Sequence, residues 1–156
     1  MKLRFVWIGK TRSAPIKELI REYTSRISKF ATIEVTELRD RSDERAARII
    51  EKEGEDLLSR TDSTPFLIAL DERGRELDSI KLAELIEKHR LAGTKEIAFV
   101  IGGPNGLSNA VRERADLVLA LSRMTLTHEL ARVVLMEQVY RAFAIIHDLP
   151  YQRQGV

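Results

Sequence analysis

The chain has 156 residues, of which 44% are hydrophobic and 32% charged, and its formal net charge is +2. This length and composition are typical of one globular domain with a real core, and no apolar run is long enough to cross a bilayer. The absence of cysteine excludes disulfides, thiolate zinc sites and a cysteine nucleophile, and it fits the reducing cytoplasm where we expect the protein to work. The three histidines lack metal-ligand spacing, so we expect no metal site.

The first half of the chain alternates short apolar runs with helical patterns. The runs predict strands at residues 3–8, 33–38 and 65–70. A first helix is expected after Ser13, which can cap it with Pro15 in the first turn. A second is expected at 46–58, with Gly54 as a weak point, after a charged and mobile connection at 39–45.

The second half continues the alternation. Asp71–Gly74 is a turn signal at the end of the third strand, and Asp78 or Ser79 can cap a helix that stops at Gly93. The remaining elements are expected to be strands at 97–101 and 117–121, a helix at 129–146 and a non-periodic tail at 148–156. The apolar stripe of the last helix is wider than one face needs, which indicates a subunit interface.

Strands that alternate with helices predict an α/β fold: a single domain over residues 1–156 whose mostly parallel sheet is flanked by helices. In such sheets the loops at the carboxyl ends of strands form ligand sites. The loop Gly102–Gly106 follows a buried strand but matches neither a Walker A sequence nor GxGxxG. It is equally compatible with a tight turn and with a ligand loop.

Each of three single features has a structural interpretation, and two of them also have a functional one. His128, at the start of the last helix, can be a cap, a surface residue or a base. Glu137 and Arg141 have the spacing of a structural ion pair within a helix. Arg153, near Tyr151, can meet a phosphate or belong to a disordered terminus.

Three segments together are much more specific: IGGPNGLS, LSRMTLTHELARVVLMEQVYRAF and the terminal PYQR. They closely resemble the RlmH family of SPOUT methyltransferases, which methylate N3 of a pseudouridine in 23S ribosomal RNA. The likeness extends over the whole length. It implies a C-terminal deep trefoil knot over roughly residues 66–150, followed by the tail.

The resemblance also implies that S-adenosylmethionine binds within the knot, in a bent form. The cofactor contacts carried over from the family are Leu70, Gly102, Gly103, Leu121, Ser122, Arg123, Met124, Thr125 and Leu126. Glycines let the backbone approach a ligand, and adenine needs an apolar slot with a few backbone hydrogen bonds.

The implied partners are a second copy of the chain, as a homodimer, and 23S ribosomal RNA in the assembled ribosome. Pseudouridine N3 carries a proton that must leave, so a base or a stabilising cation is needed. The candidates for these catalytic roles are His128, Arg132, Tyr151 and Arg153. The tail of one subunit is expected to close over the cofactor site of the other.

The sequence departs from the family pattern twice. Thr127 precedes His128 where the family has proline, and Gln152 stands where the family has histidine. Glutamine cannot exchange a proton near neutral pH, yet we expect it to position the RNA and activity to persist. The alternatives are a ribosome-binding protein that keeps the fold without catalysis, and a flavodoxin-like small-ligand module without RNA.

Overall fold

A computed structural model describes residues 1–41 and 45–153, apart from the side chain of Gln152. The strands are β1 (Lys2–Ile8), β2 (Thr32–Leu38), β3 (Phe66–Glu76), β4 (Glu96–Ile101) and β5 (Leu117–Ala120). The helices are α1 (Ala14–Ile27), α2 (Ala46–Thr61), α3 (Ser79–Leu91), α4 (Asn109–Arg114) and α5 (His128–Ile146), with a final 3₁₀ turn η1 (Pro150–Arg153).

The five strands form one sheet in the order β2-β1-β4-β3-β5, and every pairing between these described strands is parallel. The central strand β4 is buried along almost its whole length, as its unbroken run of apolar residues predicts. β2, at one edge, alternates between exposed and partly buried residues, as its alternating sequence predicts. The α/β prediction is therefore confirmed.

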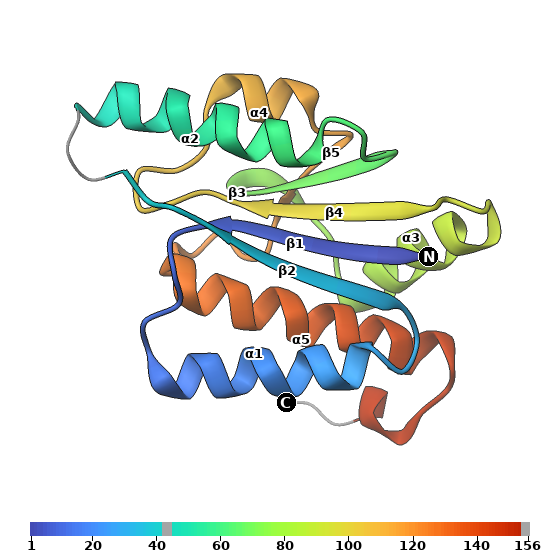
Figure 1. The fold of residues 1–156 in the computed structure, drawn as a ribbon. Helices are drawn as coiled ribbons and strands as arrows, with labels where there is room; N and C mark the ends of the chain where they lie inside the picture. The colour runs from blue at the N-terminus through green and yellow to red at the C-terminus, as the bar shows by residue number, and fades with distance from the viewer. Residues whose placement is uncertain (42–44, 154–156) are drawn as a thin grey trace.

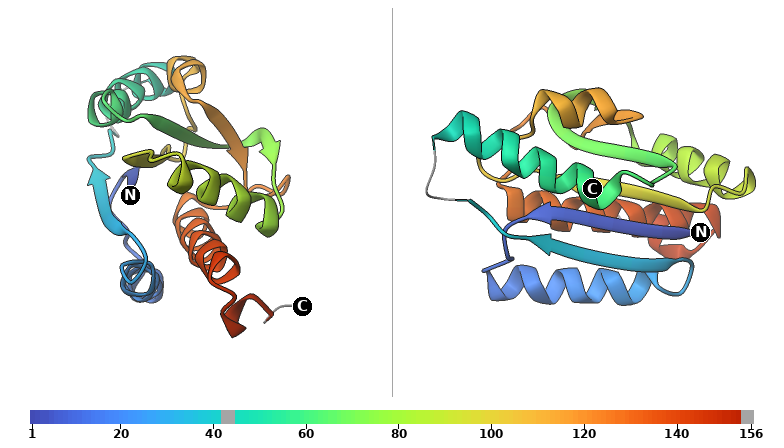
Figure 2. Two further views of the ribbon diagram at one scale, coloured as in Figure 1. Left: turned by 90° about the vertical axis from the view of Figure 1, so that its right-hand side faces the viewer. Right: turned by 45° about the horizontal axis from the view of Figure 1, so that its top comes forward.

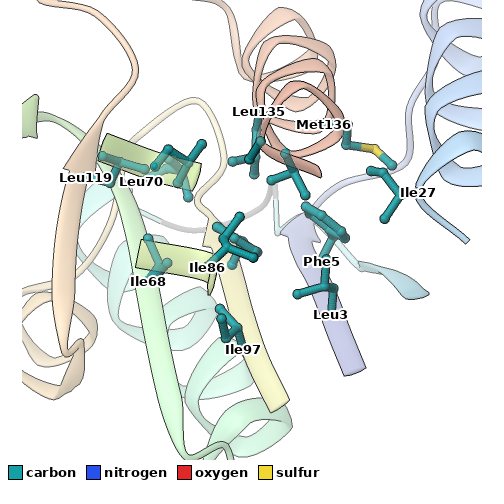
Figure 3. Close-up of a cluster of buried hydrophobic side chains, with 14 of the residues drawn as sticks. Leu3, Phe5, Ile27, Ile68, Leu70, Ile86, Ile97, Leu119, Leu135 and Met136 are labelled. Atoms are coloured by element: carbon teal, nitrogen blue, oxygen red, sulfur yellow. The ribbon is translucent and has the colours of Figure 1, made fainter. Parts of the chain in front are cut away.

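Helices cover both faces of the sheet (Figures 1 and 2). α1, α3 and α5 lie on one face and enclose the larger core, in which Phe5 stacks on Phe99 with ring centroids 5.1 Å apart. Figure 3 shows the side chain of Met136 of α5 beside Ile27 of α1. α2 and α4 cover the other face over a smaller core.

The prediction of a turn at Asp71–Gly74 is wrong, because β3 continues through these residues to Glu76. The pairing with β5 shifts register between Leu70 and Arg75 instead of ending. A Cβ on Gly74 would lie 2.6 Å from the carbonyl oxygen of Val118, so this glycine permits close packing against β5. Residues 71–74 have the composition of a turn, but they belong to a bulged strand that pairing with β5 stabilises.

Gly54 is not a weak point of its helix, and α2 runs three residues past the predicted end, to Thr61. A Cβ on Gly54 would lie 2.9 Å from Cβ of Ser108 and closer still to its hydroxyl oxygen. The glycine therefore allows α2 to approach the start of α4. α4 was not expected from the sequence, and Ser108 caps it by accepting a hydrogen bond from the Val111 N–H, 3.3 Å away.

The tail, which lacked a periodic pattern, forms η1 beside the carboxyl end of α5. Residues 154–156, and residues 42–44 of the connection that was expected to be mobile, lie outside the described residues. Among the helices that are described, none is long and apolar enough to span a bilayer. The trefoil knot stays a prediction, with which the strand order is consistent.

Candidate active site

The predicted cofactor residues meet at the edge of the sheet where the strands end. Leu70 pairs with Ile101 of β4 on one side and with Leu119 of β5 on the other. Gly102 directly follows Ile101, and the loop 121–126 directly follows β5. The fold therefore brings Leu70, the glycines and this loop side by side, although Leu70 and Leu126 are 56 positions apart in the sequence.

The extension of β3 holds the loop 121–126 in place. The Thr125 hydroxyl donates to a Glu72 carboxylate oxygen 2.6 Å away, and Arg123 pairs with Glu76. Ser122 accepts from the backbone N–H of Met124 at 2.9 Å. The polar side chains of the loop are thus engaged with the protein itself, whereas the Met124 side chain is 79% exposed.

The glycine loop folds tightly on itself. The Gly106 N–H donates to the Gly103 carbonyl at 3.0 Å, and a Cβ on Gly102 would lie 2.7 Å from the Gly106 carbonyl oxygen. A Cβ on Gly103 would lie 3.1 Å from a carboxylate oxygen of Glu53. These contacts show that the loop is a tight turn. A tight turn can also bind a ligand, and this one directly follows β4 at the carboxyl edge of the sheet.

Glu53, which lies against Gly103 of this loop, was not among the residues predicted from sequence. Its side chain is 2% exposed, and its Oε2 has no hydrogen-bond partner within the described part of the chain. Burial raises the pKa of this carboxyl group. The spacing of Glu53 in the sequence could have indicated its burial. Glu53 lies four residues from Ile49 and from Leu57, which are both on the buried face of α2.

His128 is the first residue of α5. Thr127 caps the helix by accepting from the Leu130 N–H at 3.3 Å, so the residue that replaces the family's proline has a structural role. Burial lowers the pKa of His128, and the positive charge of Arg132 lowers it further, against the opposing charge of Glu129. The imidazole is therefore predominantly neutral near pH 7 and able to accept a proton.

Arg132, one turn further along α5, is completely buried. Its guanidinium group donates to the Ile8 carbonyl at 2.7 Å and to the Thr11 hydroxyl at 2.9 Å, and it lies 5.0 Å from the Trp7 ring centroid. Nε of Arg132 has no partner among the described residues. Arg132 thus fastens the start of α5 to the end of β1.

Glu37 supplies the counter-charge, 3.6 Å from Arg132. The same carboxylate oxygen accepts from the Trp7 indole N–H at 2.9 Å and from the backbone N–H of Thr11 at 2.8 Å. Burial would raise the pKa of Glu37, but these hydrogen bonds and the charge of Arg132 outweigh burial and lower it. Glu37 is therefore ionised and engaged by the protein's own donors.

The tail candidates lie elsewhere in the same subunit. The Tyr151 hydroxyl donates to Glu137 at 2.8 Å, and its ring packs against Tyr140 and beneath Arg141. Burial raises the pKa of Tyr151, as do its bonds to Tyr23 and Glu137. The predicted ion pair between Glu137 and Arg141 is confirmed, with 2.8 Å between its nearest atoms.

Arg153 is exposed and lies 3.7 Å from the Asp148 carboxylate. Glu137, which holds the tail, comes nine residues after His128, which corresponds to roughly 14 Å along the helix axis. One subunit therefore brings the loop 121–126 and the glycines to one edge of the sheet, with His128 shortly after the loop, whereas Glu137 holds the tail with Tyr151 and Arg153 further along α5.

Comparisons with known proteins identify the family of this chain. A family model described as "Predicted SPOUT methyltransferase" matches residues 1–152. The chain belongs to the SPOUT methyltransferase family. The resemblance inferred from the glycine loop, from residues 121–143 and from the terminal PYQR is thereby confirmed at the level of the family.

Two relatives of this SPOUT protein match it almost end to end. A Trichlorobacter lovleyi protein is 48% identical over 151 residues, which cover 97% of this chain and 99% of the relative. A Geobacter sulfurreducens protein is 45% identical with the same coverage. Both carry the name "Ribosomal RNA large subunit methyltransferase H".

Solved structures support the fold of this SPOUT chain. A "probable methylase family protein" from Haemophilus influenzae has a TM-score of 0.62 at 17% identity, covering 94% of this chain and 68% of that one. A "Probable Methyltransferase" from Bordetella pertussis has a TM-score of 0.56 at 13% identity, covering 90% and 95%. At these identities the likeness concerns the fold alone.

Proposed function

We propose that this protein transfers a methyl group from S-adenosylmethionine to N3 of a pseudouridine in 23S ribosomal RNA, within the assembled ribosome. The observation that carries the proposal is the 48% identity to a named large-subunit ribosomal RNA methyltransferase along 97% of the chain. The match runs over 151 residues, so it extends over nearly the whole chain and is not confined to one motif. Work on ribosomes would place the protein in the cytoplasm.

The residues at the carboxyl edge of the sheet fit such a methyl donor. Met124, which is 79% exposed, offers apolar surface for an adenine ring, and the largely buried Leu70 ends the regular pairing of β3 at the same edge. Residues 122–127 belong to no helix or strand, and apart from the Met124 N–H and the Thr127 carbonyl, which are bonded within the protein, we assign their backbone groups as hydrogen-bond partners of the donor. The bound donor would supply an electrophilic methyl carbon attached to a positively charged sulfonium sulfur. The charge of the sulfur disappears when the methyl group is transferred.

The chain's own residues must align N3 with that methyl group and remove the N3 proton. His128 fits the role of base, because its lowered pKa keeps the imidazole neutral near pH 7. Arg132 is buried and hydrogen-bonded within the subunit. We therefore assign it the positioning of His128, rather than direct contact with the substrate.

Tyr151 and Arg153 reach the site only if a second copy of the chain supplies them. Because the two halves of the site lie apart in one subunit, we propose a homodimer in which each tail meets the partner's loop 121–126. The exposed Leu130, at the start of α5, and Leu19 of α1 provide apolar surface for this contact. Sedimentation of the purified protein should give twice the mass of one chain.

A mixed dimer tests this sharing of the site. Gly103→Val would push on Glu53 and block the loop side, whereas Arg153→Ala would remove the cation of the tail. Each variant alone is expected to be inactive. Because a mixed dimer contains one site with both halves intact, combining the two variants should restore up to about half of the activity. No recovery in verified mixed dimers would contradict the shared site.

The activity itself is tested with ribosomes that lack the methyl group. Incubation with radiolabelled S-adenosylmethionine should label 23S RNA, and mass spectrometry of the digested RNA should place the methyl group on N3 of pseudouridine. Ribosomes that carry uridine at this position, and protein-free 23S transcript, are the controls and should be poor substrates. Failure to bind S-adenosylmethionine in calorimetry would refute the proposal and favour the non-catalytic ribosome-binding alternative.

A further inference from the structure

A hollow beside the proposed site has no role in the chemistry described so far. It has a volume of about 700 Å³ and lies between the ends of β1 and β2 and the first turns of α1. Four cationic side chains line it: Lys10, Arg12, Lys17 and Arg39. All four residues are exposed, so their charged groups are accessible to a ligand from solution.

The two acidic residues of the hollow are already paired. Glu37 is neutralised by buried Arg132 and accepts hydrogen bonds from Trp7 and Thr11. Asp40 lies 3.6 Å from the guanidinium group of Arg12. With Arg132 beneath its floor, the hollow concentrates positive charge in a chain whose net charge is only +2. Such a concave positive site attracts anions.

The hollow is held next to the proposed base. Glu129 accepts hydrogen bonds from the backbone N–H groups of Arg12, at 2.8 Å, and Ser13, at 3.1 Å. These bonds tie the loop after β1 to the first turn of α5, in which His128 precedes Glu129. The charges of Arg12 and Asp40 both act on the pKa of His128, which places them near its imidazole.

The lining favours a phosphate over a base as the bound group. None of the described residues that line the hollow is aromatic, and the nearby Trp7 is 1% exposed with its indole N–H bonded to Glu37. A stacked base would need an exposed ring. Lysine and arginine side chains around a concavity instead match the oxygens of a phosphodiester.

We propose that this hollow binds a backbone phosphate of ribosomal RNA close to the nucleotide that is methylated. The inference rests on the proposed function and adds to it a subsite that holds the RNA strand while His128 faces the target base. The contact is electrostatic and independent of sequence. The phosphate contact therefore contributes affinity and fixes the position of the RNA strand on the protein. The nucleotide to be methylated is selected by other contacts.

The test compares two double variants with the same loss of charge. Lys17→Ala with Arg39→Ala removes two cations of the hollow. Lys29→Ala with Lys95→Ala is the matched control, because Lys29 follows the far end of α1 and Lys95 precedes β4 at the opposite edge of the sheet. Dissociation constants for methyl-deficient ribosomes are measured across a series of salt concentrations.

The hollow variant should bind ribosomes roughly tenfold more weakly near physiological salt, and its log–log salt slope should be smaller by about 1.5 than that of the wild type. The KM for ribosomes should rise, with kcat at saturation unchanged. The control variant should match the wild type. Both variants should retain the wild-type affinity for S-adenosylmethionine, melting temperature and dimer mass.

Equal affinity and salt slope for the two variants would overturn the inference. A loss of dimer mass or of cofactor affinity in the hollow variant would also overturn it, because the cations would then be structural. Normal binding to protein-free ribosomal RNA with weakened binding to ribosomes would point to an acidic ribosomal protein instead. Wild-type protein that binds ribosomes in the predicted manner without methylating them would refute the proposed function and leave the phosphate subsite standing.

Discussion

Replacement of Arg132 by methionine tests whether this residue positions the site or touches the substrate. Methionine keeps an unbranched side chain in the buried space but removes the charge and both hydrogen bonds, to the Ile8 carbonyl and the Thr11 hydroxyl. The change leaves Glu37 without its counter-charge. Breaking a buried ion pair costs about 3–5 kcal/mol. The Glu37 side chain remains 34% exposed, so water compensates in part and we expect a loss of about 3 kcal/mol.

A more conservative replacement separates the two roles further. Arg132→Lys keeps the charge but loses the planar fork that reaches Ile8 and Thr11 together, so we expect a smaller loss of about 1–2 kcal/mol. In Arg132→Met the pKa of His128 should rise, because the nearby positive charge that lowers it is gone. In Arg132→Lys the pKa of His128 should change less.

Urea unfolding followed by circular dichroism measures the loss of stability, and NMR titration of the His128 ring measures its pKa. Arg21→Met, on the exposed surface of α1, is the matched control and should change the unfolding free energy by less than about 0.5 kcal/mol. The reasoning is refuted if Arg132→Met and Arg132→Lys fold as stably as the control, leave the His128 pKa unchanged and yet abolish turnover. Arg132 would then act on the substrate directly.

Three further predictions concern other parts of the chain. Gly54→Ala should lower the unfolding free energy by roughly 1–2 kcal/mol, because overpacking against Ser108 outweighs the helix propensity of alanine, and Ser108→Gly should recover part of the loss. Native protein with Gln152 should methylate ribosomes; product from Gln152→His alone would show that a histidine is required. The lowered pKa of His128 means that the unfolded chain binds more protons, so stability should fall as the pH drops below the ordinary value of 6.5, and the fall should be weaker in His128→Gln.

The strands and long helices could be predicted because their apolar residues recur with the period of each element. The extension of β3 could not, because Asp71–Gly74 has the composition of a turn. Only the presence of β5 makes that segment a strand, through Arg75 and Glu76. α4 has six residues, too few for a helical period to stand out. In both places a contact distant in sequence decides the local structure.

The candidate site was predictable from the sequence only in part. The glycine loop and the loop 121–126 carry motifs that identify a family, and the fold then brings them together. The buried polar groups were harder to foresee, because a charged residue type gives no direct indication of burial. Glu53 and Arg132 both lie on stripes of helical spacing among apolar residues, at 49–57 and 132–139. An isolated charge within such a stripe is the signal that could have indicated the burial of both residues, although the family resemblance had already named Arg132 as a candidate.

If Tyr151 and Arg153 belong to the site, as we propose, the last helix explains why one subunit would not complete it. α5 has 19 residues and is therefore about 28 Å long. Arg132 fixes its start to β1, Leu135 and Met136 bury its middle in the core, and Glu137 with Arg141 holds Tyr151 near its end. Closing the distance within one chain would mean breaking the core contacts or releasing the tail from Tyr140. If the tail of a second copy reaches the loop 121–126, neither the core contacts of α5 nor the contacts of the tail need to break. The rigid packing of α5 is therefore a physical reason to expect a dimeric enzyme.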